Sequence, residues 1–166
     1  MIIRSLQPPD AEAYVALRRE ALLDSPLAFA ASPEDDLAGS VESFLSQLKQ
    51  VPDAVIFGAF SPELAGITGL YRDRHVKARH KMHLWGMYVT PTHRGRGTAT
   101  ELLQAGIEHA GSLSGIDWVQ LSVTSAAPGA RRLYERAGFQ LWGTEPDSLR
   151  QAGGSVIEHH LVLRLD

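Results

Sequence analysis

The stretch MYVTPTHRGRGTATELLQAGIEHA, residues 87–110, decides the fold of this chain. It begins as an apolar strand, turns at a Thr-Pro pair, passes through a Gly-Arg-Gly step and continues as an amphipathic helix. The N-terminus of a helix presents unpaired N–H groups and about half a positive charge, so it binds anions and phosphates in particular. A strand that turns into a helix through these residues therefore predicts a phosphate site.

Two glycines and two arginines make this turn specific. Gly95 and Gly97 allow the backbone to approach a ligand closely, and Arg94 and Arg96 add charge-assisted hydrogen-bond donors. The pattern is not a Walker A loop, because no Gly-Lys-Ser or Gly-Lys-Thr follows, and it lacks the three glycines of the dinucleotide fingerprint. We interpret it as a cradle for a pyrophosphate. The alternative is a glycine turn that caps an ordinary helix.

The composition limits the classes of protein to which the chain can belong. Its length fits a single domain spanning residues 1–166, and a formal net charge of −3 does not suit a general nucleic-acid binder. The absence of cysteine excludes disulfides, thiolate zinc sites and cysteine nucleophiles. No apolar run is long enough for a signal peptide or a membrane span. We therefore expect a cytoplasmic protein without a membrane partner.

The rest of the sequence alternates between strand and helix patterns. Strands are expected at residues 1–6, 54–60, 65–73, 80–90, 118–124, 139–145 and 155–165. Besides the helix of the opening stretch, helices are expected at residues 8–25, 32–50 and 128–139. The helix at 32–50 is inferred from one apolar face made of Leu37, Val41, Phe44 and Leu48. Residues 146–154 are expected to form a loop.

The order of these elements predicts an α/β fold. A strand followed by a helix and a second strand implies a right-handed crossover, so the fourth and fifth strands should lie parallel. The strands before them are joined by short turns and should form an antiparallel meander. Pro128 and Gly138 mark the start and the end of the last helix. The prediction is a three-layer domain with a mixed sheet of six or seven strands and four helices.

The motif RGRGTA resembles the Arg/Gln-x-x-Gly-x-Gly/Ala signature of the GCN5-related N-acetyltransferase (GNAT) superfamily, with Arg94, Gly97 and Ala99 at its defined positions. The preceding MYV is similar to the fourth strand of that family. ARRLYERAGF resembles its later helix, which carries a tyrosine shortly before Gly-Phe. The resemblance covers nearly the whole chain and implies the GNAT-like acyl-CoA N-acyltransferase fold, in which the parallel fourth and fifth strands splay apart.

The resemblance also implies an activity, the transfer of an acetyl group from acetyl-CoA to a primary amine of a small molecule, peptide or protein. Acetyl-CoA would be the acyl-donor cosubstrate, with its pantetheine arm on the fourth strand and its pyrophosphate on the helix amides. A backbone N–H near Met87 would stabilise the oxyanion. The residues implied in binding are Met87, Tyr88, Val89, Arg94, Gly95, Arg96, Gly97, Thr98, Ala99 and Thr100.

Two side chains are candidates for proton transfer. Tyr134 resembles the family tyrosine that protonates the leaving thiolate, and a phenol with a pKa of about 10 can donate a proton at neutral pH. The alternative is a core aromatic. His83 is a candidate base, because it lies four residues before Met87 and is expected on the same strand face. The alternatives are a half-buried strand histidine and water as the base.

One position departs from the family pattern. Relatives commonly carry an asparagine three residues before the alanine that here is Ala130, but this chain has Ala127. Ser125 is a candidate to replace the missing hydrogen bond to the cosubstrate. The departure favours an alternative function, a non-catalytic acyl-CoA-binding sensor module, whereas Tyr134 favours the enzyme.

Several further features have two interpretations each. The basic stretch at residues 72–81 suits an acidic peptide or RNA, or else the solvated tip of a hairpin. The acidic residues 33–36 suit a cationic amine, or else the first turn of a helix. No metal site is expected, because neighbouring histidines such as His159 and His160 point to opposite strand faces. The alternating strand at 155–165 is a candidate surface for a homodimer.

Overall fold

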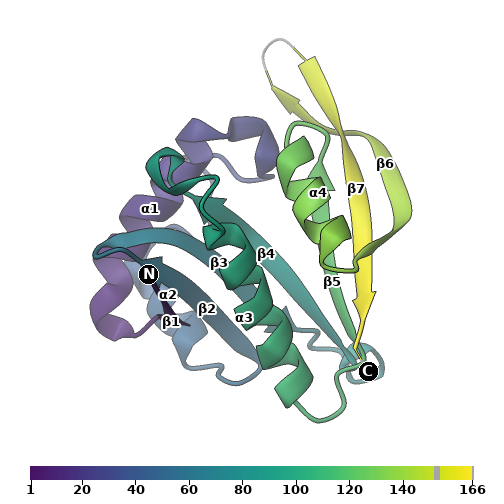
Figure 1. The fold of residues 1–166 in the computed structure, drawn as a ribbon, viewed down its shortest axis with the longest axis horizontal. Helices are drawn as coiled ribbons and strands as arrows, with labels where there is room; N and C mark the ends of the chain where they lie inside the picture. The colour runs from purple at the N-terminus through teal and green to yellow at the C-terminus, as the bar shows by residue number, and fades with distance from the viewer. Residues whose placement is uncertain (152–153, 166) are drawn as a thin grey trace.

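The computed structural model describes residues 1–151 and 154–165, which form one mixed sheet flanked by helices (Figure 1). The strands in this part of the chain are β1 (Ile2–Ser5), β2 (Ala54–Phe60), β3 (Leu64–Arg72), β4 (Lys81–Val89), β5 (Trp118–Thr124), β6 (Gln140–Gln151) and β7 (Gly154–Arg164). The α-helices are α1 (Ala11–Asp24), α2 (Val41–Leu48), α3 (Thr98–Ser112) and α4 (Pro128–Arg136). The expected three-layer α/β fold is confirmed.

The sheet order is β1-β2-β3-β4-β5-β7-β6, and among these neighbours β4 and β5 run parallel while the others are antiparallel. Helices α3 and α4 cover one face of the sheet, and α1 and α2 cover the other (Figure 1). In the described residues, none of the helices is both long enough and apolar enough to cross a membrane.

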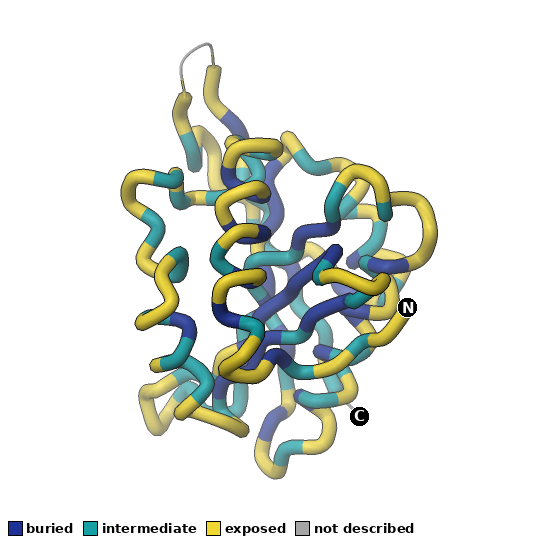
Figure 2. Tube along the Cα trace, turned by 90° about the vertical axis from the view of Figure 1, so that its left-hand side faces the viewer, coloured by how far each residue is buried: buried dark blue, intermediate teal, exposed yellow. Residues whose placement is uncertain are grey.

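Each face of the sheet has its own apolar core. Leu70, Met82 and Val119 pack with Leu103 of α3 on one face, and Ile56 and Ile67 pack with residues of α1 and α2 on the other. These residues belong to the central strands, where Figure 2 shows the buried chain in dark blue. Removing both faces of the sheet from water is the main stabilising contribution to the fold.

Strands β4 and β5 pair over a short distance only. Their parallel partners are Lys81 with Trp118, Met82 with Val119, and His83 with Gln120. Both strands continue beyond these pairs, and Figure 1 shows them diverging from the end near the C-terminus. The separation leaves the last residues of β4 without a neighbour on that side, as the predicted splay requires.

The helix predicted at residues 32–50 is wrong in its first half. Helix α2 begins only at Val41, and Leu37 is 91% exposed. The carboxylate of Asp36 accepts hydrogen bonds from Arg18 and from the amide of Ala38, which holds this segment in turns. Local side-chain bonds of this kind compete with helix formation. The N-cap is Ser40, whose hydroxyl accepts the amide N–H of Ser43.

The prolines of the first predicted helix form a separate 3-10 turn, Pro8–Asp10, that leads directly into α1. The loop predicted at residues 146–154 is wrong for residues 146–151, which continue β6, while its residues 152–153 lie outside the described residues. Pro146 and Asp147 occupy an irregularity in the pairing between Glu145 and Leu149, and Asp147 has a positive φ of 54°. A proline is tolerated there because β6 is an edge strand.

Substitution of Gly69 tests the packing of the Trp85 indole across β3. A Cβ atom on Gly69 would overlap the indole ring of Trp85, its partner on β4. We expect Gly69→Ala to lower the free energy of unfolding by about 1–3 kcal/mol, because the indole must leave its place against the core. Urea denaturation measures this change.

The matched control is Gly111→Ala. Gly111 lies in α3 with open space at its Cβ position, and alanine in a helix is favoured over glycine by about 0.5–1 kcal/mol. This variant should keep or gain stability. Equal losses in the two variants would contradict the proposed role of the indole contact.

Candidate functional site

A cavity of about 860 Å³ opens where β4 ends and α3 begins. Its walls come from the end of β4, the turn before α3, the first residues of α4 and residues 24–29. Of the residues predicted to bind a cosubstrate, those that line it are Met87, Tyr88, Val89, Arg94, Gly95, Gly97, Thr98, Ala99 and Thr100. Arg96 is exposed and lies outside this set.

The start of α3 supplies the anion-binding groups of this cavity. Gly97 is the N-cap in a left-handed conformation (φ 86°), and it provides no side chain to cap the helix. Glu101 is the first residue of α3 whose amide N–H donates a helical hydrogen bond, and its acceptor is the carbonyl of Gly97. The amides of Thr98 and Ala99 are thus available to a ligand. Gly95 also has a positive φ of 73°. The positive φ at both positions explains why the motif has glycine there.

Arg94 has a different environment from the one its motif suggested. Its Nε donates to the carbonyl of Val89 at 2.9 Å, and its Nη2 forms an ion pair with Asp24. The hydrogen bond from Arg94 holds the pKa of the Asp24 carboxyl below its usual range. The guanidinium also lies 5.4 Å from the ring centroid of Tyr88. These contacts join Arg94 to the end of β4 and to Asp24, so Arg94 positions the wall of the cavity.

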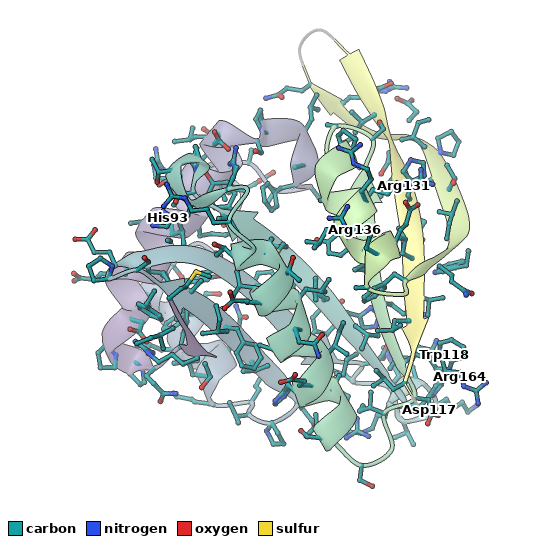
Figure 3. The ribbon with its side chains drawn as sticks, viewed as in Figure 1. His93, Asp117, Trp118, Arg131, Arg136 and Arg164 are labelled. Atoms are coloured by element: carbon teal, nitrogen blue, oxygen red, sulfur yellow. The ribbon has the colours of Figure 1, made fainter. Side chains whose placement is uncertain are left out.

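Two side chains that the sequence did not predict line the same cavity, namely His93 and Arg136. Figure 3 shows Arg136 on α4 and His93 in the turn before α3, on the other side of the start of that helix. Arg136 has no ion-pair or hydrogen-bond partner among the described residues. It is therefore available to an anionic ligand. No sequence signal marks it, because exposed arginines are common at helix ends.

Tyr134 packs into the core instead of lining this cavity. It is 4% exposed, and its ring meets Phe139 edge to face at 6.0 Å between centroids. Burial raises the pKa of its phenol, so the hydroxyl is protonated at neutral pH. Its neighbour Leu133 lines the cavity. The expectation that one of these two consecutive residues must pack inward is confirmed, and that residue is Tyr134.

The start of α4 presents an apolar wall where the family pattern has an asparagine. Ala127 is the N-cap residue of α4, provides no side-chain cap and lines the cavity. Ser125 lies outside the lining, and its hydroxyl accepts the amide of Ile157 at 3.2 Å. The hydroxyl of Ser125 therefore contacts β7 and is not part of the cavity wall.

A bulge in β4 overturns one sequence expectation. Tyr88 pairs with Ile67 and Trp85 with Gly69, so Gly86 and Met87 both lie opposite a single residue of β3. Gly86 has a positive φ of 65°. An extra residue in one strand reverses the alternation of side chains beyond it. His83 and Met87 are therefore on opposite faces of the sheet, and the prediction that they share a face was wrong.

The contacts on either side of the bulge confirm this reversal. Before it, Met82 and Leu84 pack on the α3 side while Trp85 packs on the α1 side. After it, Met87 packs on the α3 side and Tyr88 on the α1 side. The odd-numbered residues of β4 thus lie on the α1 side of the sheet before Gly86 and on the α3 side after it.

A second cavity, of about 500 Å³, lies on the face that His83 occupies. Its polar and aromatic lining residues are Arg18, Phe29, Tyr71, His83, Trp85, Gln120, Ser122, Trp142, Glu158 and His160. The two cavities share Ala28 and Phe29, and the consecutive bulge residues Gly86 and Met87 line one cavity each. Two ligands can therefore approach the bulge of β4 from opposite faces of the sheet.

His83 is half-buried in the second cavity. Its ring stacks on Tyr71 at 4.8 Å between centroids, and its Nε2 lies 3.4 Å from the carboxylate of Asp73. A hydrogen bond from the amide of His75, together with the contact to His83, holds the pKa of Asp73 below its usual range. The histidines of β7 diverge as expected, since His160 contacts Ser122 of β5 and His159 contacts Arg131 of α4.

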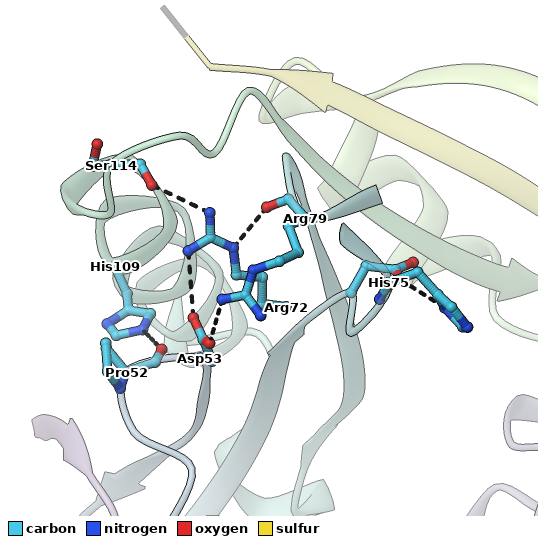
Figure 4. Close-up of polar contacts among 8 residues, drawn as sticks. Pro52, Asp53, Arg72, His75, Arg79, His109 and Ser114 are labelled. Atoms are coloured by element: carbon cyan, nitrogen blue, oxygen red, sulfur yellow. Dashed lines mark hydrogen bonds and ion pairs between the residues drawn. The ribbon is translucent and has the colours of Figure 1, made fainter. Parts of the chain in front are cut away.

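The basic stretch at residues 72–81 forms the connection between β3 and β4 and partly neutralises itself. Arg72 and Arg79 both pair with the carboxylate of Asp53, at 3.4 and 2.8 Å (Figure 4). The Nε of Arg72 also donates to the carbonyl of Arg79 at 2.6 Å. These contacts order the hairpin tip and leave less positive charge for an external partner than the sequence suggested.

A splayed parallel strand pair, a helix N-terminus at its mouth and a cavity on each face define the acyl-CoA N-acyltransferase class of fold. The family comparison agrees. Residues 8–139 match the model of the Acetyltransferase (GNAT) family, and the chain belongs to this family. The expected acyl-donor cosubstrate is therefore acetyl-CoA, and the cradle at the start of α3 is suited to its pyrophosphate.

Similar solved structures agree in fold. An acetyltransferase of the GNAT family from Streptococcus pneumoniae superimposes with a TM-score of 0.88 at 21% identity over 99% of both chains. An acetyltransferase from Salmonella typhimurium, solved with its cofactor acetyl-CoA, gives 0.86 at 19% identity over 100% of this chain and 94% of that one.

A mycothiol acetyltransferase from Thermobispora bispora is 32% identical over 147 residues. The match covers 84% of this chain but 46% of that protein, so the chain spans less than half the length of this relative.

The two arginines of the first cavity should differ in how salt affects CoA binding. Arg136→Ala removes an unpaired positive charge, so its loss of CoA affinity should be larger at low than at high ionic strength. Arg94→Ala removes contacts to Val89 and Asp24, so its loss should vary little with salt and be accompanied by a lower thermal midpoint. Calorimetric titration at two salt concentrations measures both effects.

Arg132→Ala is the matched control for this comparison, because Arg132 is exposed on α4 and lies outside the cavity lining. It should leave CoA affinity unchanged at both salt concentrations. If Arg94→Ala showed the steep salt dependence and Arg136→Ala showed none, the assignment of the two roles would be reversed.

Proposed function

We propose that this chain transfers an acetyl group from acetyl-CoA to a primary amine by direct attack of the amine on the thioester. The observation that carries the proposal is the pair of cavities that meet at the bulge of β4, one beside the anion-binding start of α3 and one on the other face. Such an arrangement holds donor and acceptor together, so orientation lowers the barrier without a protein nucleophile.

In this proposal the backbone of β4 supplies the electrostatic groups. The separation of β4 and β5 leaves Met87, Tyr88 and Val89 without a strand neighbour on the β5 side, so their backbone can pair there with the pantetheine arm. The bulge at Gly86 and Met87 interrupts the hydrogen-bond ladder with β3. An N–H freed there would stabilise the negative charge that develops on the thioester oxygen.

Tyr134 and His83 are the proposed proton carriers. Tyr134 does not itself line the first cavity, but its neighbour Leu133 does, and in this proposal the phenol, kept protonated by its raised pKa, protonates the leaving CoA thiolate beside Leu133. His83 lines the cavity on the opposite face and would accept the proton that the amine loses. The proton given to the thiolate and the proton taken from the amine would thus be transferred on different faces of the sheet.

The alternative function is a non-catalytic acyl-CoA sensor. The apolar wall at Ala127 supports it, since the chain lacks the usual side-chain contact to the cosubstrate. An enzyme and a sensor share the cradle and differ in turnover. Screening thiol release from acetyl-CoA with amines, polyamines, amino acids and peptides separates them, because tight CoA binding without turnover of any amine would favour the sensor.

We further propose that residues 1–166 are one cytoplasmic N-acetyltransferase domain that forms a homodimer through its C-terminal hairpin. The edge strand β6 exposes Leu141 and Trp142, and β7 exposes Ile157. An apolar edge of this kind favours pairing with a second copy. Light scattering at micromolar concentration should give a dimer mass, and a monomer mass would exclude the dimer.

Replacement of Tyr134 by phenylalanine tests the general acid. Tyr134→Phe keeps the ring and its contact with Phe139, so acetyl-CoA binding and stability should persist while turnover falls about 10²- to 10⁴-fold. Tyr14→Phe is the matched control, because Tyr14 is also buried and lies on the opposite side of the sheet. Unchanged turnover in Tyr134→Phe would remove the phenol from the mechanism.

The pH dependence of kcat/KM tests the base. If His83 must be neutral to accept a proton, kcat/KM should fall on the acidic side of the pH profile, and this acidic limb should disappear in His83→Gln. His75→Gln is the control, since His75 is highly exposed and also contacts Asp73. A limb that survives in His83→Gln assigns the proton to water or to another group.

A further inference from the structure

Arg18 is a buried charge in the wall of the second cavity. It lies on α1 with 6% of its surface exposed. Its Nε and Nη2 donate to the two carboxylate oxygens of Asp36, at 2.9 and 3.1 Å. The side chains of both partners are more than nine-tenths buried, so this bidentate pair holds the guanidinium plane in one orientation.

The remaining nitrogen of Arg18, Nη1, has no hydrogen-bond partner in the described chain. It faces the bulge of β4, because a Cβ atom on Gly86 would lie 3.5 Å from it. The rings of Phe29 and Trp85 flank the guanidinium at 5.4 and 5.7 Å. A charged donor is thus fixed in the acceptor cavity, beside the position where the two cavities meet.

An arginine held in this way favours an anionic ligand. Because Nη1 keeps some contact with solvent, a ligand oxygen there would replace water and gain a charge-assisted hydrogen bond from a donor that is already held in place. Since Asp36 occupies the far edge of the guanidinium, the positive end of the ion pair points toward the cavity. A carboxylate matches a planar guanidinium better than a neutral carbonyl does, because both groups are then charged.

The rest of the cavity suits a small zwitterion with an apolar side chain. Tyr71, Trp85 and Trp142 provide aromatic surface. Glu158, which accepts a hydrogen bond from Ser148 at 2.7 Å, supplies negative charge in the same cavity. The cavity thus offers one group for a carboxylate, one for an ammonium and an aromatic surface for a side chain.

We propose that the acceptor is a free α-amino acid with an aromatic or large apolar side chain, whose carboxylate binds Nη1 of Arg18. The inference rests on the proposed function and names its substrate class. The α-amine loses a proton to the base and its nitrogen attacks the thioester carbon. The C–N bond forms and the C–S bond breaks. The thiolate takes up one proton, so the products are an N-acetyl amino acid and free CoA.

The experiment compares amino acids with the amines that lack their carboxylate. Initial rates of thiol release are measured with acetyl-CoA and three pairs: phenylalanine and 2-phenylethylamine, tryptophan and tryptamine, leucine and isoamylamine. The wild-type protein should show a kcat/KM about 10- to 100-fold higher for the amino acid of the preferred pair, the effect of one charge-assisted contact. Equal or higher values for the amines in every pair overturn the proposal.

Variants of α1 locate the contact. Arg18→Lys keeps the charge opposite Asp36 but loses the planar fork, so it should reduce the ratio of kcat/KM between the amino acid and its amine about 10-fold or more. Arg19→Lys is the matched control, because Arg19 is the exposed neighbour on the same helix, and it should retain the preference. A preference that persists in Arg18→Lys overturns the assignment to Arg18.

The remaining outcomes separate this inference from the proposed function. If a tripeptide beginning with phenylalanine is acetylated faster than the free amino acid, the carboxylate is not recognised and the inference is wrong while the acetyltransferase remains. If other amines are acetylated but none of the six probes is, the inference is again wrong while the acetyltransferase remains. If no amine is acetylated although CoA binds, the proposed function itself fails. The comparison within the wild type does not depend on the folding of any variant.

Discussion

The one-residue bulge in β4 is the constraint on which the candidate site depends. Without it, the side chains of β4 would alternate regularly, and Met87 would share the face of His83. With it, Gly86 faces one cavity and Met87 faces the other. The bulge requires a positive φ, which glycine adopts without the steric cost that other residues carry. A single backbone conformation thus assigns the two cavities to opposite faces of the sheet.

The segment between α1 and α2 is the second element that both cavities need, because Ala28 and Phe29 line each of them. It is held in three places. Asp24 pairs with Arg94, Asp36 pairs with Arg18, and the buried hydroxyl of Thr124 on β5 donates to the carbonyl of Leu27 at 2.7 Å.

These three contacts connect the segment to the turn before α3, to α1 and to β5. Arg94, the arginine of the family motif, therefore helps to hold the segment that lines both cavities. The low pKa of Asp24 means that its pair with Arg94 contributes stability above the ordinary pKa of an aspartate, and that this contribution is lost as the pH falls.

Much of the fold and the first cavity was predictable from local patterns. The strands at 54–60 and 118–124 agree with the sequence to the residue, since alternation and flanking turn residues define them. The turn into α3, with a positive φ at Gly95 and Gly97, was predictable because glycines, arginines and the start of a helix are consecutive in the chain. The roles of Arg94 and Arg136 were not, because each depends on a residue or a space far away in the sequence.

The sequence by itself determined the order of the elements, the parallel pair β4 and β5, the anion-binding turn and the family. These properties follow from the type and spacing of neighbouring residues. Only the tertiary structure decided where β4 bulges, that residues 33–40 fold around Asp36 instead of forming a helix, and that Arg18 keeps one donor for a second cavity. The bulge and the position of Arg18 involve contacts between residues 17 or more positions apart, for which a single sequence carries no local signal. The turns before α2 combine such a contact, between Arg18 and Asp36, with a local one between Asp36 and the amide of Ala38.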